Sequence, residues 1–446
     1  MQQQIHELDV GRLEQSYRRR QLDPAQVCDH LLARIDDPQV NCNAFAHVDH
    51  DAARAAARAS SERRRDDRAL GPLDGIPLAI KDVLDVAGMP TRYGSAACAQ
   101  APPARNDCLL AQRLRAAGAV ILGKTRTWEF AWRSNPARDP AEVVRNPHDP
   151  ACSPGGSSTG SAAAVAAGLC PLAFGTDSGG SVRGPAAFCG IVGFKPSHAL
   201  IPIYPPSPMG DIEHIGIFAR SVDDVRTALD QVGGSHPDDP ASWPFRVPLP
   251  VPDVAVDALR FGCSVDLNYA DPQPELRAHF NALIERLRRS GLNIEARAIA
   301  FRAEFEKCYD LFLADAALTL ELAPPEWRHL VDPEIVKLAH QGEQMNAVDY
   351  ARVELLRGEL QRVFAREFVE IDCLLTLTQQ AAANRLDREP GIMKLTRWFN
   401  LTGQPAISIP CGSSPAGMPI GLQLVCERGA DSLLLGIAAR IAAALA

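Results

Sequence analysis

Residues 153–196 read SPGGSSTGSAAAVAAGLCPLAFGTDSGGSVRGPAAFCGIVGFKP and carry the strongest structural signal in the chain. An alanine-rich helix is predicted over 161–168, where it ends in glycine, and an apolar strand is predicted over 171–176. A turn rich in glycine and serine precedes the helix, and a second one follows the strand. A helix and a buried strand in close succession favour an α/β sheet.

The same alternation of short apolar strands and helices extends outward from this stretch. Strands are predicted over 76–80 and 119–122, and a helix over 107–118. Proline-rich stretches at 201–210 and 236–253 cannot be central strands and are predicted to be loops. The sequence therefore predicts a large α/β sheet with helices on its faces.

The 446 residues show no internal repeat, and we interpret residues 1–446 as a single domain rather than two independent ones. Its first part, 1–70, is predicted to be helical, and 71–232 is the predicted core. The remainder, 233–446, is rich in loops and helices. It contains a long helix around 347–370 and ends with strands at 405–410 and 420–426, followed by an apolar helix.

Composition excludes several classes of function. The formal net charge of −8 argues against a nucleic-acid partner or an anionic membrane surface. The first residues lack the pattern of a signal peptide, and the apolar runs are too short to span a bilayer. The 12 cysteines are scattered without a C-x-x-C pair, so a zinc site is not expected. We predict a cytoplasmic protein with reduced thiols.

The turn at 153–161 allows three interpretations. Gly155 and Gly160 have the spacing of a phosphate-binding loop, but Ser161 stands where that loop requires lysine. The residues before the turn are also not a hydrophobic strand. A plain turn that caps the following helix is the simplest alternative. The third interpretation is that Ser157 belongs to a relay of hydroxyl groups.

The second turn and an upstream lysine favour the relay. Ser181 follows Gly179 and Gly180, and consecutive glycines allow backbone amides to converge on one point, as an oxyanion hole requires. Lys81 directly follows the residues 76–80 of the predicted strand. Taken alone, such a lysine is more often an exposed strand end than a catalytic base.

Together these segments resemble the amidase signature family of Ser–Ser–Lys hydrolases. Three blocks carry the resemblance: PLDGIPLAIKDVLDVAGMPTRYGS at 72–95, the stretch 153–196, and GMPIGLQLV at 417–425. The resemblance implies a large, mostly mixed sheet flanked by helices on both faces. It also implies that Ser181 is the nucleophile, Ser157 the bridging serine, held through a cis peptide, and Lys81 the base.

Further roles follow from the same resemblance. The backbone amides of four residues are expected to form the oxyanion hole: Ser178, Gly179, Gly180 and Ser181. Three residues are expected to brace the two turns: Asp177, Arg183 and Ser161. Gly184 is a candidate for the substrate pocket, or a glycine that positive φ requires. His198 and His214 are interpreted as pocket-lining or surface residues, because a Ser–Ser–Lys mechanism needs no histidine.

The chemistry places one demand on Lys81. A serine hydroxyl becomes a good nucleophile only when a base takes its proton. Lysine can be that base only when neutral, so its pKa must fall from about 10.4 to about 7–8, which burial achieves. No metal and no organic cofactor is implied.

We therefore predict an amidohydrolase that cleaves a small-molecule carboxamide through an acyl-enzyme and releases ammonia or an amine. One alternative is the amidase-type subunit of a glutamine-dependent tRNA amidotransferase, and another is a catalytically idle scaffold. The chain departs from the family pattern at Thr159, usually glycine, and in the stretches 195–216 and 374–386. The last two shape the expected pocket, so the substrate stays open. A homodimer is compatible with these predictions.

Overall fold

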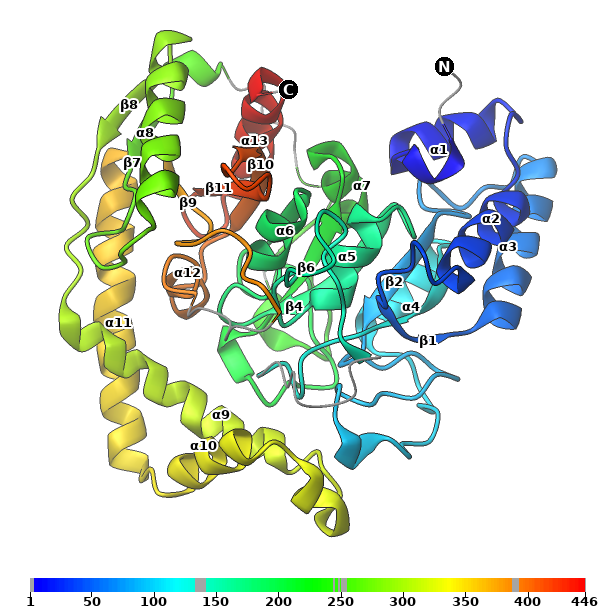
Figure 1. Ribbon diagram of the computed structural model, residues 1–446, viewed down its shortest axis with the longest axis horizontal. Coiled ribbons are helices and arrows are strands. Elements are labelled where there is room, and N and C mark those ends of the chain that lie inside the picture. The colour runs from blue at the N-terminus through cyan, green and yellow to red at the C-terminus, as the bar shows by residue number, and fades with distance from the viewer. Residues whose placement is uncertain are drawn as a thin grey trace.

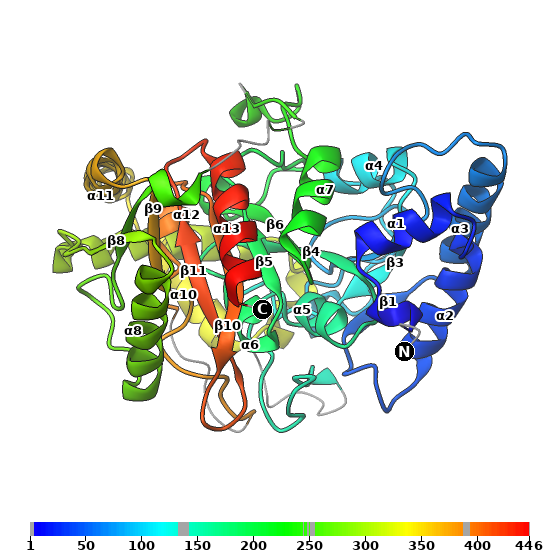
Figure 2. The ribbon, with the colours of Figure 1, turned by 90° about the horizontal axis from the view of Figure 1, so that it is seen from above.

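In the computed structural model, which describes residues 4–132, 142–243, 245–247, 249, 255–386 and 393–445, the core is one sheet. The sheet has 11 strands in the order β1-β3-β2-β4-β6-β5-β10-β11-β9-β7-β8. Figure 2 shows it crossing the molecule from β8 at one end to β1 at the other. The strands are β1 Phe45–Val48, β2 Pro77–Lys81, β3 Val120–Thr125, β4 Leu172–Asp177, β5 Val192–Lys195, β6 His214–Ala219, β7 Arg260–Cys263, β8 Asn293–Ala296, β9 Cys373–Leu377, β10 Ala406–Ser413 and β11 Pro419–Val425.

Helices surround this sheet (Figure 1). They are α1 Val10–Arg18, α2 Pro24–Asp36, α3 His50–Arg65, α4 Leu109–Ala116, α5 Thr159–Ala166, α6 Arg183–Cys189, α7 Val222–Val232, α8 Pro274–Arg289, α9 Asp310–Leu320, α10 Pro333–Glu343, α11 Ala347–Glu370, α12 Trp398–Leu401 and α13 Asp431–Leu445. None of the helices in the described ranges is long and apolar enough to cross a membrane.

The sheet is mixed. β2 runs parallel to both β3 and β4, whereas β4 pairs with β6 in the antiparallel sense. The predicted fold class, a mixed α/β sheet with helices around it, is confirmed. The long helix predicted around 347–370 is also present as α11.

The N-terminal segment contains one strand among its helices. The prediction that residues 1–70 are helical throughout is wrong at β1, which pairs with β3 at the edge of the sheet. This strand has only four residues, all half-buried, so no strong alternation of polar and apolar residues marks it.

In the predicted loop 236–253, positions 244, 248 and 250–253 lie outside the described residues, and the described part is irregular apart from one short turn of helix at Pro240–Ser242.

The topology explains why the two turns meet. Because β2 and β4 are parallel neighbours, Lys81 and Asp177, their last residues, lie at the same edge of the sheet. α5 packs against β4 and immediately precedes it in the chain, so the start of α5 returns to that edge. Small side chains let α5 lie within the core, where residues 159–165 are all buried.

Candidate active site

Lys81 is fully buried at the end of β2. Its Nζ donates to Ser157 Oγ at 2.8 Å and to Thr176 Oγ1 at 2.8 Å. Within the described ranges Lys81 forms no ion pair. Lys124, which is equally buried, instead lies 2.9 Å from a carboxylate oxygen of Asp82. The two shortest contacts of Lys81 Nζ are thus to hydroxyl groups, as a proton relay requires, and a longer one of 3.5 Å reaches the Thr176 carbonyl.

Burial lowers the pKa of Lys81 to about 7, because the charged ammonium form loses its hydration. The negative charges of Glu213 and Asp177 oppose this shift but do not cancel it. A substantial fraction of Lys81 is therefore neutral near pH 7. This is the protonation state that a general base needs.

Ser157 is held through its backbone. The Gly156–Ser157 peptide bond is cis, and the Ser157 carbonyl accepts hydrogen bonds from the Trp128 amide and the Thr127 hydroxyl, both at 3.1 Å. The Trp128 ring packs directly on Gly156, where an added Cβ would lie 2.0 Å from a ring carbon. Only glycine permits this close approach, which keeps the Ser157 hydroxyl next to Lys81.

Ser181 lies in the turn between β4 and α6. The Ser158 amide donates to the Ser181 carbonyl at 3.3 Å, so the backbones of the two serine-containing turns are in direct contact. Ser181 is partly exposed, whereas Lys81 and Ser157 are buried. The Ser181 hydroxyl makes no hydrogen bond to any other described residue, which leaves it available to a substrate.

The amides of the second turn do not all point the same way. The Gly180 amide donates to the Asp177 carboxylate at 2.7 Å, and the Val182 amide donates to the same carboxylate at 3.1 Å. The expectation that Gly180 contributes to an oxyanion hole therefore needs correction. The amides of Ser178, Gly179 and Ser181 have no partner in the described part of the chain and remain candidates.

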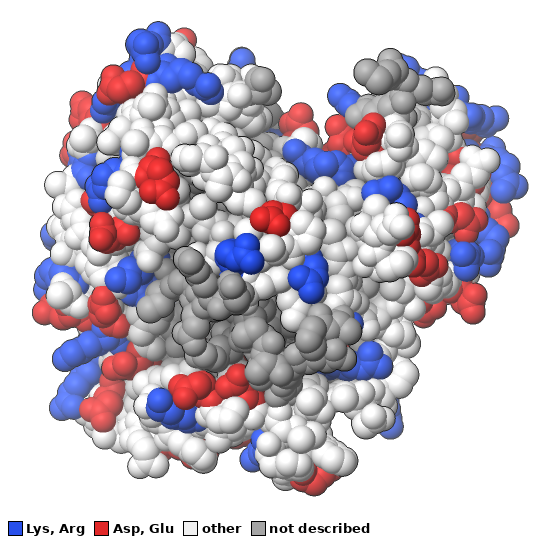
Figure 3. Space-filling model, viewed as in Figure 1, with Lys and Arg blue, Asp and Glu red and all other residues white. Residues whose placement is uncertain are grey.

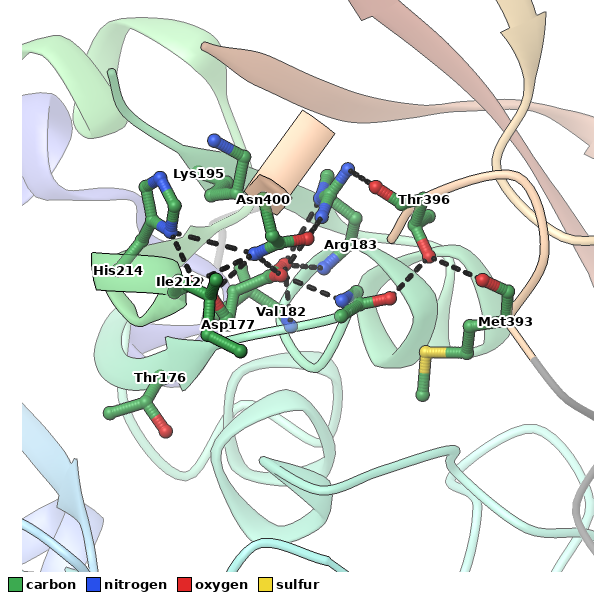
Figure 4. A network of polar contacts seen from close by, with 12 residues as sticks. Thr176, Asp177, Val182, Arg183, Lys195, Ile212, His214, Met393, Thr396 and Asn400 are labelled. Carbon is green, nitrogen blue, oxygen red and sulfur yellow. Dashed lines mark hydrogen bonds and ion pairs between the residues drawn. The ribbon is translucent and has the colours of Figure 1, made fainter. Parts of the chain in front are cut away.

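A buried ion pair holds this turn in place (Figure 4). Arg183 and Asp177 are fully buried, with Arg183 Nη2 2.8 Å and Nε 3.0 Å from the two carboxylate oxygens. Asn400 donates to the same carboxylate at 2.8 Å and accepts from Arg183 at 2.6 Å. Burial would raise the pKa of Asp177, but the Arg183 guanidinium outweighs it and holds that pKa well below its usual range.

Replacing Arg183 with methionine should lower the free energy of unfolding by about 3–5 kcal/mol, because Asp177 would remain buried without its counter-charge. Urea unfolding followed by circular dichroism measures this change. Arg352 forms an exposed pair with Asp349, so Arg352→Met is a matched control with no measurable change expected. A loss below about 1 kcal/mol for Arg183→Met would contradict the bracing role.

Other residues named from the sequence occupy supporting positions. The Ser161 hydroxyl donates to the Phe174 carbonyl at 3.1 Å and lies 2.7 Å from the Thr125 hydroxyl, so it ties α5 to β4 and β3. His214 is not a surface residue. It is buried in β6, its Nδ1 lies 3.5 Å from Asn400 Nδ2, and burial depresses its pKa strongly.

Gly184 lies in α6 and does not have positive φ, so that explanation for the glycine is wrong. A Cβ at this position would lie 2.2 Å from Nε2 of Gln379. The space beside Gly184 is thus occupied by the Gln379 side chain, from the segment that follows β9. Gln379 falls in the stretch 374–386 that departs from the family pattern.

A cavity of about 170 Å³ is lined in part by Thr176, a hydroxyl partner of Lys81. The proline-rich segment 202–209 and Glu213 form part of its wall. This segment belongs to the other departing stretch, 195–216. The two stretches that depart from the family pattern, 195–216 and 374–386, thus supply residues around the site but none of the three relay residues.

Three residues that hold the site were not identified from the sequence. Thr176 contacts Lys81, Asn400 bridges Asp177 and Arg183, and Thr396 donates to the Gly179 carbonyl at 2.7 Å. Thr176 directly precedes Asp177, which is a signal that could have been used. Thr396 and Asn400 lie more than 200 positions away, and no local pattern marks them. Among the described residues, no cluster of three or more histidine, cysteine or acidic residues could hold a metal ion.

Comparison with known proteins gives concordant results. The family model described as Amidase matches residues 26–435. A glutamyl-tRNA(Gln) amidotransferase subunit of Chloroflexus aurantiacus is 34% identical, with 97% of this chain and 96% of that protein aligned. A solved structure described as an amidase has a TM-score of 0.87 at 30% identity, over 98% of this chain and 100% of that one. The 6-aminohexanoate cyclic dimer hydrolase has a TM-score of 0.86 at 27% identity, over 99% and 98%.

Proposed function

We propose that this chain, which belongs to the amidase family, cleaves the C–N bond of a carboxamide through an acyl-enzyme on Ser181. The observation that carries the proposal is the environment of Lys81. A fully buried lysine with hydroxyl partners and a pKa lowered to about 7 is suited to accept a proton. A buried lysine that stays charged is normally paired with a carboxylate, as Lys124 is with Asp82.

The proposed reaction uses a relay of three groups. Neutral Lys81 takes the proton of Ser157 as Ser157 takes the proton of Ser181, whose hydroxyl is proposed to contact Ser157 once substrate is bound. The Ser181 oxygen then attacks the amide carbon. The negative charge that develops on the carbonyl oxygen is stabilised by backbone amides of the turn that remain free. Ser157 returns the proton to the nitrogen as the C–N bond breaks, and water hydrolyses the acyl-enzyme by the same relay.

The similar proteins differ in what happens to the ammonia that amide cleavage releases. Relatives from several bacteria are amidotransferase subunits, and they support the glutamine-using function better than a free amidase. The similar solved structures include an amidase and the 6-aminohexanoate cyclic dimer hydrolase. We propose amide cleavage as the step common to both, with glutamine as the first substrate to test.

The names of the relatives argue against one prediction made from the sequence, the exclusion of a nucleic-acid partner. Their name contains tRNA, whereas the net charge of −8 argues against a nucleic-acid partner. Net charge describes a whole chain and does not exclude an enzyme that supplies ammonia to a tRNA-modifying partner. On the face shown in Figure 3, basic and acidic side chains are interspersed. For the amidotransferase function, we propose that a partner protein contacts the tRNA.

The direct test is ammonia release by the purified chain. Glutamine, short aliphatic amides and aryl amides are each incubated with the wild-type chain and with Ser181→Ala. Turnover of a simple amide by the single chain supports a free amidase. Turnover of glutamine, without turnover of any simple amide, supports the amidotransferase function. No turnover of any amide, together with no labelling of Ser181 by a fluorophosphonate, would refute the proposal.

Activity should rise with pH through about 7. The neutral amine of Lys81 is the active form, and its fraction grows about tenfold per pH unit below the pKa and levels off above it. A profile of kcat/KM between pH 5 and 9 measures the dependence. A flat profile, or a fall through pH 7, would contradict the assignment of Lys81 as the base.

Gly184→Val should lower kcat/KM for amides with bulky acyl groups about 10- to 100-fold more than for acetamide. The added side chain must displace Gln379, whose flexible end fills the adjacent space. The double variant Gly184→Val/Gln379→Ala serves as the control and should recover most of this loss. Equal losses for all amides, accompanied by a lower Tm, would show that Gly184 serves packing alone.

A further inference from the structure

Arg397 is a buried cation without a counter-charge. It precedes α12 and is only 7% exposed. Its guanidinium donates to the Tyr269 hydroxyl and forms no ion pair with any described residue. Glu306 influences it electrostatically but is itself exposed and not in ion-pair contact. Burial lowers the pKa of Arg397 to about 10, so the side chain stays charged at neutral pH.

The surroundings of Arg397 are aromatic and rich in hydrogen-bond donors. Its Cζ lies 3.5 Å from the ring centre of Tyr309 and 4.6 Å from that of Trp398. The Tyr309 hydroxyl, Trp398 Nε1 and Arg397 Nε are all buried, and none has a hydrogen-bond partner in the described part of the chain. One of these donors belongs to Arg397 itself and the other two to aromatic side chains that contact it, and buried donors without a partner are costly unless an acceptor binds them.

This donor set lies beside the turn that carries Ser181. Thr396, the neighbour of Arg397, donates to the Gly179 carbonyl at 2.7 Å. The Cβ of Arg397 is 3.8 Å from the position a Cβ would take on Gly179. The Phe312 ring approaches the same position at 4.0 Å and stacks on Tyr309. Arg397 and Phe312 therefore border the turn that carries Ser181.

We propose that Arg397, with Tyr309 and Trp398, receives a carboxylate carried by the acyl part of the substrate. The preferred substrates are then monoamides of dicarboxylic acids, a class to which glutamine belongs. This inference rests on the proposed amide cleavage at Ser181. A guanidinium matches a carboxylate in charge and geometry, and the aromatic rings around it exclude water that would weaken the attraction.

Binding measured without turnover tests the proposal. Ser181→Ala serves as the parent, and Kd is determined by calorimetry for succinamate, glutaramate and adipamate. Each is compared with a neutral analogue that has an isopropyl group in place of the carboxylate. At least one acid should bind about 10- to 100-fold more tightly than its analogue. Adding Arg397→Met should abolish this preference and leave Kd for the analogues nearly unchanged.

Two further variants make the result decisive. Tyr309→Phe removes one hydroxyl and should weaken the acids about 3- to 10-fold, which keeps the test available if Arg397→Met does not fold. Arg362→Met, at an exposed position of α11, is the matched control without effect on any ligand. Equal Kd values for acids and analogues in the parent would show that Arg397 only packs against the rings. Failure of amide cleavage would appear separately, as absent turnover by the wild-type chain.

Discussion

Replacing Ser181 with alanine should lower kcat by about 10⁴- to 10⁶-fold for any amide that the chain cleaves. The substitution removes the oxygen that forms the acyl-enzyme, and the relay of Ser157 and Lys81 then has nothing to deprotonate. Ammonia release at saturating substrate measures the loss. Because the Ser181 hydroxyl makes no hydrogen bond to other described residues, Tm should not fall.

The backbone of the turn should keep its structure in Ser181→Ala. Asp177 accepts the Gly180 and Val182 amides, and these bonds do not involve the Ser181 hydroxyl. KM should therefore change little in Ser181→Ala. A variant that kept more than about a hundredth of the wild-type kcat would contradict the assignment of Ser181 as the nucleophile.

Lys81→Met should lower kcat by about 10²- to 10⁴-fold and remove the rise in activity through pH 7. Methionine fills a similar volume but cannot take a proton. The site is fully buried and contains no ion pair partner for Lys81 among the described residues, so no charge is left uncompensated. Folding should be preserved, which separates this effect from a loss of structure.

Lys337→Met is the matched control, because Lys337 is an exposed lysine paired with Glu334 on the surface of α10. It should leave kcat and the pH profile unchanged. Near wild-type kcat in folded Lys81→Met would overturn the proposed relay. A reduced kcat with an unchanged pH profile would show that another group provides the base.

The short-range features of the site could be predicted from the sequence. Ser157 and Ser181 lie in glycine-rich turns, and Lys81 ends an apolar strand, so each carries a local signal. Their association follows from the parallel pairing of β2 and β4, which strand patterns alone do not specify. The family resemblance provided that link. The structure places Lys81 against Ser157 accordingly.

The long-range features could not be predicted. Asn400 and Thr396 reach the second turn from more than 200 positions away, and nothing in their own neighbourhood marks them as polar anchors. The direction of individual amides is equally hidden, since whether Gly180 faces a substrate or Asp177 depends on the folded turn. No pattern around Arg397 indicates that it lies buried against Tyr309 and Trp398, because that contact exists only in the folded chain.

The most direct test of the account is the identification of the residue that reacts with a fluorophosphonate, by peptide mass spectrometry of the wild-type chain and of Ser181→Ala. The account predicts a single adduct on Ser181 in the wild-type chain, formed faster as pH rises through about 7, and no adduct in the variant. An adduct on another residue that persists in Ser181→Ala, or amide turnover by a wild-type chain that never reacts, would contradict it.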